Sequence, residues 1–131
     1  MNKLKILAVD DEENLLYCIS NTLDKYDVTI EKSSVAAMHL LEKEHFDIII
    51  ADYQMPTING VELLEEAKEY SKNKHYIAIL CTAHGTTYLF KDEKENGLFQ
   101  FFLEKPFTTE TLSKVVARAV TQLTKVCANG T

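Results

Sequence analysis

Residues 5–16, KILAVDDEENLL, combine an apolar run with a strongly charged turn. The run from Ile6 to Val9 ends at four consecutive acids, residues 10–13, and the apolar pattern restarts at Leu15 and Leu16. A short apolar run without polar alternation is typical of a strand that is buried on both faces of a parallel sheet. The stretch therefore predicts a strand, a turn and a helix, with an excess of negative charge at the turn.

The same pattern recurs along the chain. Three further apolar runs, at residues 48–51, 77–80 and 99–103, have the length of strands. Residues 27–32, DVTIEK, alternate apolar and polar side chains instead, which is typical of a strand at the edge of a sheet. Apolar residues at helical spacing predict the intervening helices, within residues 14–26, 33–41, 60–70, 86–97 and 111–123.

The helix expected within residues 86–97, TTYLFKDEKENG, is the weakest of these. Its large apolar side chains are confined to Tyr88, Leu89 and Phe90. Most helical stability in proteins comes from packing of an apolar face, and this segment has little to pack. We therefore expect a marginal, mobile helix there.

Strict alternation of strands and helices predicts an α/β fold with a parallel sheet covered on both faces. Right-handed crossovers and an edge-like second strand favour the strand order 2-1-3-4-5, the flavodoxin-like doubly wound (βα)5 sandwich. A chain of 131 residues fits one domain. We expect that domain to span residues 1–131, with a core of about 3–124 and a short C-terminal tail, 125–131.

Charge and cysteine content narrow the functional classes. The net charge of −6 argues against binding of nucleic acid or an anionic membrane surface by this domain. The three cysteines are widely spaced, which argues against a disulfide framework or a zinc site and favours a reducing, cytoplasmic setting. Neither a signal sequence nor an apolar run long enough to span a bilayer is apparent.

In a sheet of this topology, ligands bind beyond the carboxyl ends of the strands, at the point where the strand order reverses. The predicted strands end at Asp10-Asp11, Asp52, Thr82 and Lys105. Each has an ordinary structural explanation, since acids favour helix N-termini, aspartate starts turns and lysine is usually exposed. Their convergence on one rim is harder to explain in that way.

Clustered carboxylates repel one another unless a cation joins them, and Mg²⁺ or Mn²⁺ is the natural hard cation for Asp10, Asp11 and Asp52. Magnesium sites of this kind often include a phosphate oxygen. Lys105 would balance the charge of a phosphoryl group, Thr82 would donate a hydrogen bond to it, and the central Asp52 is the candidate nucleophile. The two following acids, Glu12 and Glu13, are expected to serve capping and solubility.

Four stretches together resemble response regulator receiver domains: ILAVDDEENL at 6–15, DIIIADYQMPTINGVELL at 47–64, ILCTAH at 79–84 and FFLEKPFTTETL at 101–112. The resemblance extends from Lys3 to about Thr124. It implies that Asp52 is the phosphoacceptor. It also implies that Asp10, Asp11, Asp52 and the backbone carbonyl of Gln54 are the metal ligands.

The resemblance assigns the remaining site residues as well. Thr82 corresponds to the switch hydroxyl, Phe102 to the switch aromatic and Lys105 to the lysine of the family pattern. The Lys105-Pro106 bond is expected to be cis, although only about 5–6% of X-Pro bonds are cis. Gln54 and His84, each two residues beyond a site residue, are expected to tune the lifetime of the phosphoryl group.

The function implied is a signalling switch rather than an enzyme. A sensor histidine kinase or a phosphotransfer protein would supply the phosphoryl group, and slow self-dephosphorylation would remove it. A downstream output domain or protein and a homodimer remain open as partners. The alternatives are a degenerate receiver that acts only as an interaction module, a flavodoxin-like electron carrier, whose FMN phosphate the acids would repel, and a haloacid-dehalogenase-like hydrolase, which needs a second aspartate where Gln54 stands.

Overall fold

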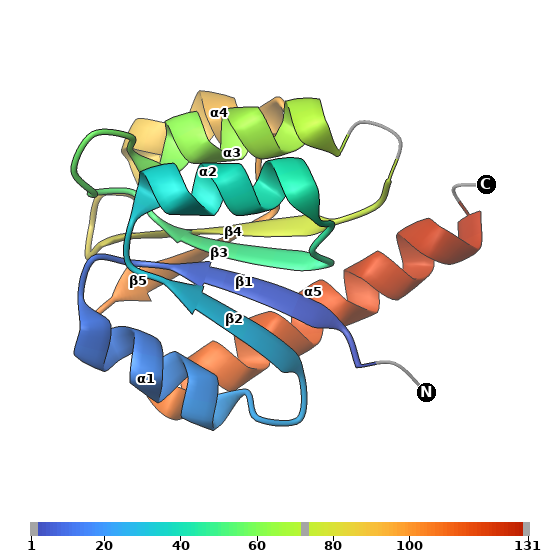
Figure 1. The fold of residues 1–131 in the computed structure, drawn as a ribbon, viewed down its shortest axis with the longest axis horizontal. Helices are drawn as coiled ribbons and strands as arrows, with labels where there is room; N and C mark the ends of the chain where they lie inside the picture. Colours follow the sequence, from blue (N-terminus) through green and yellow to red (C-terminus); the bar gives the residue numbers. More distant parts are fainter. Residues whose placement is uncertain (1–2, 72–73, 130–131) are drawn as a thin grey trace.

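The computed structural model describes residues 3–71 and 74–129 as a three-layer α/β sandwich (Figure 1). Its strands are β1 Lys5–Val9, β2 Asp27–Glu31, β3 Ile48–Asp52, β4 Ile77–Ala83 and β5 Phe101–Lys105. Its helices are α1 Glu13–Thr22, α2 Ser34–Lys43, α3 Gly60–Tyr70, the 3-10 helix η1 Thr87–Phe90, α4 Lys91–Glu95 and α5 Thr109–Asn129.

All strand pairs are parallel, and the strands lie in the order β2-β1-β3-β4-β5. Helices α2, α3 and α4 cover one face of the sheet, and α1 and α5 cover the other (Figure 1). The predicted flavodoxin-like topology is therefore confirmed. The central strand β3 is buried along its whole length, as its unbroken apolar run requires.

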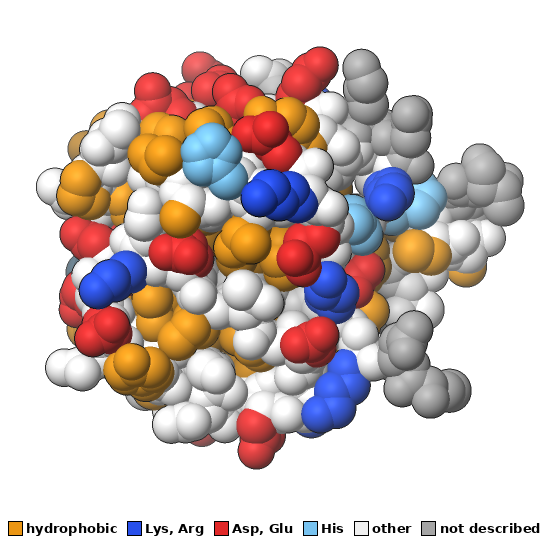
Figure 2. Space-filling view, in the orientation of Figure 1, with side chains coloured by type: hydrophobic (Ala, Val, Ile, Leu, Met, Phe, Trp, Pro, Cys, Tyr) orange, Lys and Arg blue, Asp and Glu red, His pale blue; other side chains and the backbone are white. Residues whose placement is uncertain are grey.

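Each face of the sheet packs its own apolar core. One core joins the sheet to α2 and α3 through residues such as Leu41, Leu63 and Leu64. The other joins it to α1 and α5 through residues such as Leu16 and Val116. Acidic, basic and apolar side chains are interspersed on the face seen in Figure 2. Among the described residues, no helix is long and apolar enough to cross a membrane.

Three of the differences between the predicted boundaries and the structure have a clear physical cause. The helix expected over 14–26 ends at Thr22, because the chain must turn to start β2, where the Asp27 N–H donates to the Leu4 carbonyl over 2.9 Å. The strand expected at 99–103 begins at Phe101. Just before it, the Gln100 N–H donates to the Ala78 carbonyl over 2.9 Å, but the Ala78 N–H donates to the Gln100 side-chain oxygen over 2.8 Å instead of to a main-chain carbonyl.

The third boundary lies at the C-terminal end. Helix α5 continues through residues 125–129, which we expected to form a tail, and its end reaches beyond the sheet (Figure 1). The segment Lys125 to Ala128 contains no glycine or proline, so nothing in it breaks the helix. Residues 130 and 131 of the expected tail lie outside the described residues.

The segment predicted to be a marginal helix is indeed short. Helix α4 has five residues, buries none of them and follows the 3-10 helix η1 directly. By contrast, α3 has eleven residues and a capping box between Asn59 and Glu62. The difference follows from the apolar content of the two segments, because α3 buries Leu63, Leu64 and Ala67.

Candidate functional site: a carboxylate cluster at the strand ends

The strand ends bring the predicted acids together at one rim of the sheet. Asp10 follows β1 and Asp52 ends β3, and both are buried, whereas Asp11 is exposed. One carboxylate oxygen from each of the three lies within 4.8 Å of the other two. Because β1 and β3 are neighbours in the sheet, Asp10 and Asp52 lie close together in space although they are 42 positions apart in sequence.

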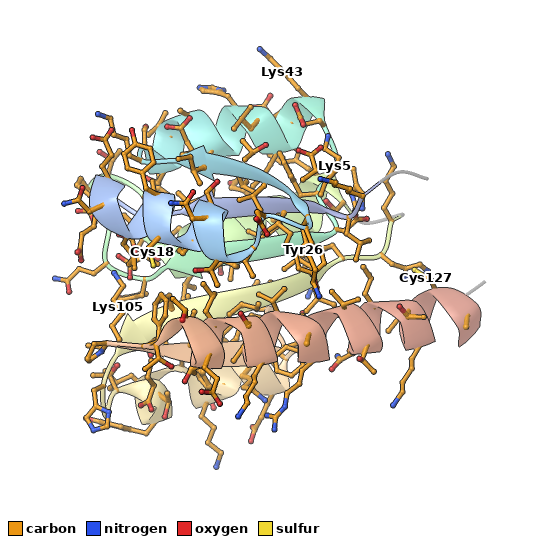
Figure 3. The ribbon with its side chains drawn as sticks, turned by 90° about the horizontal axis from the view of Figure 1, so that it is seen from below. Lys5, Cys18, Tyr26, Lys43, Lys105 and Cys127 are labelled. Atoms are coloured by element: carbon orange, nitrogen blue, oxygen red, sulfur yellow. The ribbon has the colours of Figure 1, made fainter. Side chains whose placement is uncertain are left out.

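Lys105, at the end of β5, provides the positive charge at this rim (Figure 3). Its Nζ lies 2.8 Å from Asp10 Oδ2 and 3.3 Å from Asp52 Oδ1. Glu12 Oε1 lies 3.5 Å from the same atom. The ammonium group therefore bridges two buried carboxylates, an arrangement that offsets part of their negative charge and holds their positions.

Thr82 provides the hydroxyl group of the rim, and this group makes no hydrogen bond to the described residues. Its side chain is 2% exposed, and its Oγ1 has no hydrogen-bond partner among the described residues. A buried hydroxyl without a partner is unfavourable, and such groups in native proteins call for an explanation. Since Thr82 lines the same cleft as Asp52 and Lys105, a ligand with acceptor oxygens is the simplest one.

Burial and charge act in opposite directions on the two partners of the Asp52–Lys105 pair. Burial and the nearby Asp10 charge raise the pKa of Asp52 to about 6, although Lys105 opposes the shift. Burial alone would lower the pKa of Lys105, but its hydrogen bond to Asp10 and the charges of both aspartates outweigh burial and raise that pKa. At neutral pH the site therefore has an ionised, poorly stabilised carboxylate beside a fixed cation.

Cys81, the residue before Thr82, contributes no reactive thiol to the site. Its side chain is buried, and burial raises its pKa to about 12. A thiol with such a pKa stays protonated at neutral pH and is a poor nucleophile. Its backbone carbonyl has a structural role, because it accepts the Tyr53 N–H over 2.9 Å and so anchors the residue that follows Asp52.

Gly60, the first residue of α3, packs directly against the backbone of the site. Its N–H donates to the Tyr53 carbonyl over 2.9 Å. A Cβ atom at this position would lie 2.5 Å from the Asp52 carbonyl oxygen and 2.9 Å from the Tyr53 Cα. We interpreted Gly60 only as a helix start. The only sign of this close contact in the sequence is the glycine itself. The contact with Asp52 depends on tertiary structure, which the local sequence does not reveal.

The expectation for Glu12 is corrected by the structure. Glu12 is the residue that precedes α1, but its side chain makes no capping hydrogen bond. Instead Asp10 Oδ1 accepts the Glu12 N–H over 2.9 Å, and the Glu12 carboxylate faces Lys105. The negative charge after β1 is thus drawn toward the lysine across the sheet rather than toward the helix end.

The other predicted residues lie at the edges of the site. Gln54 is exposed and lines the cleft. His84 is also exposed, with its Nδ1 4.0 Å from Glu104 Oε2, so it faces solvent rather than the carboxylates. Phe102 lies apart from the cluster and is half-buried, with its ring 5.0 Å from that of Phe99 in an edge-to-face arrangement. The Lys105-Pro106 peptide bond is cis, as the resemblance implied.

The donor set fits a hard divalent cation. Three carboxylates within reach of one another, two of them buried, supply the oxygen ligands that Mg²⁺ and Mn²⁺ prefer. Asp10, Asp11 and Asp52 are the residues that would hold such an ion. Among the described residues, no other group of histidine, cysteine and acidic side chains comes together in this way.

Comparison with known proteins agrees with this geometry. The model of the response regulator receiver domain matches residues 6–117. The chain belongs to the response regulator receiver family. Receivers are signalling domains of two-component systems and bind Mg²⁺ at an acidic pocket, which here corresponds to the aspartate cluster.

The relatives of this receiver include both short and long proteins. A chemotaxis protein CheY homolog of Campylobacter jejuni is 30% identical over 115 residues, which cover 85% of this chain and 88% of that protein. The 3',5'-cyclic-nucleotide phosphodiesterase regA of Dictyostelium discoideum is 28% identical over 119 residues, or 88% of this chain, but the match spans only 15% of its length.

A solved structure extends the comparison to three dimensions. The response regulator receiver domain protein from Clostridium thermocellum superimposes with a TM-score of 0.82 at 27% identity. The match covers 94% of this chain and 98% of that one. The family therefore accounts for the topology as well as for the motifs.

Proposed function

We propose that this receiver is a phosphorylation-dependent signalling switch whose phosphoacceptor is Asp52. The observation that carries the proposal is the grouping of a buried aspartate with a raised pKa, a half-buried lysine that bridges two aspartates, and a threonine hydroxyl with no partner among the described residues. A phosphoryl group on Asp52 would use the lysine and the hydroxyl together. Among the alternatives, a degenerate receiver has no need of this complete set.

The phosphoryl donor in the proposed reaction is a phosphohistidine of a sensor kinase or phosphotransfer protein. An Asp52 carboxylate oxygen attacks phosphorus, the phosphorus–nitrogen bond breaks, and its electron pair returns to the imidazole ring, which takes up a proton. Lys105 offsets the charge on the phosphoryl oxygens, and the Thr82 hydroxyl donates a hydrogen bond to one of them. Mg²⁺, held by Asp10, Asp11, Asp52 and the Gln54 carbonyl, would lower the repulsion between the incoming phosphoryl oxygens and the acids.

The proposed signal is a change in the surface formed by α4, β5 and α5. When Thr82 moves toward the phosphoryl group, Phe102 turns inward to take up the space. The half-buried ring of Phe102 lines a surface groove with Tyr88 and Lys91, separate from the cleft of Asp52. Helix α4, which buries no residue, is an element that can respond at little cost in free energy.

We further propose that residues 1–131 act as one receiver domain in the cytoplasm. The three cysteines are all free thiols, as a reducing compartment requires. Gln54 and His84 lie at the mouth of the site and beside it, where they would influence the access of water and therefore the lifetime of the phosphoryl group.

Phosphorylation by a small donor tests the proposal directly. Incubation with Mg²⁺ and acetyl phosphate should add one phosphoryl group by mass spectrometry, stable in acid and labile in base. Asp52→Asn should abolish the adduct. Asp24→Asn, which removes an exposed aspartate at the opposite end of α1, is the matched control and should be modified like the wild type.

Two results would contradict the proposal: an unmodified wild-type protein, or an adduct that survives in Asp52→Asn. A separate measurement tests the proposed movement of Phe102. With beryllofluoride bound, the Phe102 ring should point inward, and a ring that keeps its half-exposed position would contradict that part of the proposal alone.

A further inference from the structure

The cleft that contains Asp52 is larger and more apolar than a phosphoryl group requires. It has a volume of about 970 Å³ and is lined by apolar side chains as well as by the charged cluster. Tyr53, Leu89 and Phe90 line it on the face covered by α3 and α4, and Leu15 and Phe107 line it on the face of α1 and α5. The phosphoryl site therefore opens between two apolar walls.

Leu89 differs from the other apolar residues of these walls. Phe90 is 6% exposed and packs against Tyr53, with ring centroids 4.6 Å apart. Leu89 is 58% exposed, and it belongs to neither apolar core of the described chain. Of the large apolar side chains that are exposed in the described residues, Leu89 alone also lines the cleft of Asp52.

The chemistry of phosphoryl transfer directs the leaving group toward this wall. The attacking and leaving oxygens lie roughly in line with phosphorus. With Asp52 buried at the floor and Lys105 and Thr82 beside it, the leaving group must extend away from the floor, into the open part of the cleft. That part is where the exposed side chains of the lining, Leu89 among them, are found.

We propose that this cleft favours acyl phosphates with a short alkyl chain over acetyl phosphate, and that Leu89 provides the contact. The inference rests on the proposed phosphorylation of Asp52. In the step, an Asp52 oxygen bonds to phosphorus, the bond from phosphorus to the acyl oxygen breaks, and the electron pair leaves with the carboxylate product. The alkyl chain loses contact with water against Leu89, which stabilises the bound donor.

The test compares acetyl phosphate with butyryl phosphate at equal, subsaturating concentrations in the presence of Mg²⁺. Two additional methylene groups with partial burial should raise the initial rate of Asp52 phosphorylation about fivefold. Leu89→Ser should reduce the ratio of the two rates to near one. Tyr88→Ser is the matched control, because Tyr88 is 74% exposed, adjacent in sequence and not part of the cleft lining, and it should leave the ratio unchanged.

Direct binding provides a second measurement that does not depend on transfer. Non-transferable phosphonate analogues of the two donors should shift the methyl NMR signals of Leu89, and the butyryl analogue should do so at lower concentration. Equal rates for both donors, or a preference that survives Leu89→Ser, would overturn the inference while leaving phosphorylation of Asp52 intact. Absence of an Asp52 adduct with either donor would overturn the proposed function itself.

Discussion

The two ends of the parallel sheet, marked by Lys5 and Lys105 in Figure 3, differ in how their polar groups are paired. At the amino ends of the strands, Asp47 Oδ2 accepts the Lys5 N–H over 2.8 Å, and the Asp47 carbonyl accepts the Ile77 N–H over 2.9 Å. Asp47 thus joins β1 to the start of β4. At the carboxyl ends, the carboxylates of Asp10, Glu12 and Asp52 lie within 3.5 Å of Lys105 Nζ. The Thr82 hydroxyl there has no partner among the described residues.

The difference lies in what the acidic side chain at each end does for the stability of the native state. Asp47 satisfies backbone donors and acceptors that would otherwise be unpaired, which stabilises the native state. Asp52 is raised in pKa by burial and by Asp10, so its ionised form is less stable in the folded protein than in water. Under the proposed function, this charge is retained for chemistry although it costs stability, and packing elsewhere in the fold supports it.

The largest effect on stability is expected from a substitution that disturbs the packing around Asp52. Gly60→Ala places a Cβ atom 2.5 Å from the Asp52 carbonyl oxygen, a backbone atom that cannot rotate away. We expect a loss of about 3 kcal/mol in the free energy of unfolding. Chemical denaturation measures this loss.

Gly97→Ala is the control at the end of the neighbouring α4. Gly97 has a φ of +82°, but a Cβ there meets nothing within 4 Å. The cost should be only the strain of a left-handed alanine, about 1 kcal/mol. Equal losses for the two variants would show that the Asp52 backbone is less tightly packed than the structure indicates.

Removal of the Asp52 charge should have the opposite effect and increase the free energy of unfolding. In metal-free protein near pH 7, Asp52→Asn should increase the free energy of unfolding by about 2 kcal/mol, because it removes an unfavourable buried charge. The folded pKa of about 6 exceeds the unfolded value of 3.8, so the native state holds a proton that the unfolded state has lost between these values. The wild-type stability should therefore fall relative to Asp52→Asn as the pH rises from about 4 to 6 and change little above that.

Denaturation of both proteins in EDTA across this pH range measures the difference. Saturating Mg²⁺ should diminish or reverse it, since a cation relieves the repulsion that Asp52→Asn removes. A difference that is independent of pH would contradict the raised pKa.

A substitution at the amino ends of the strands should instead lower the free energy of unfolding. Asp47→Ala leaves the Lys5 N–H without its acceptor, and we expect a loss of about 1.5 kcal/mol. Asp47→Asn retains an acceptor oxygen and should lose much less. The comparison of the two strand ends would fail if Asp47→Ala and Asp52→Asn shifted the denaturation midpoint in the same direction.

The convergence of the candidate site residues at one rim could be predicted from the sequence, because strand ends can be predicted from apolar runs. Asp10, Asp52, Thr82 and Lys105 each follow or end such a run, and parallel topology then brings them to one rim. Sequence reasoning missed the contact of Gly60 with Asp52, and it gave Glu12 a capping role that it does not have. Both depend on how distant segments lie against each other.

Local sequence signals also predict the boundaries of helices and strands only approximately. The end of α1 is determined by where β2 must begin, and the start of β5 by a side-chain hydrogen bond of Gln100, neither of which is a property of the segment itself. By contrast, the weakness of α4 was predictable, because it follows from the absence of apolar residues in the segment.

The smallest effect is expected at the exposed ion pair that completes the amino end. Lys5 Nζ lies 2.7 Å from Glu44 Oε1, and the hydrogen bond to Glu44 raises the Lys5 pKa. Both side chains are more than a third exposed, so water and salt screen the pair. Glu44→Gln should lower the free energy of unfolding by no more than about 0.5 kcal/mol, and the loss should vanish in high salt. Glu65→Gln, at an exposed helical position on α3, measures the background effect of removing one acid. A loss for Glu44→Gln that approached the Asp47→Ala loss would mean that charge itself, rather than the pairing of backbone groups, stabilises this end of the sheet.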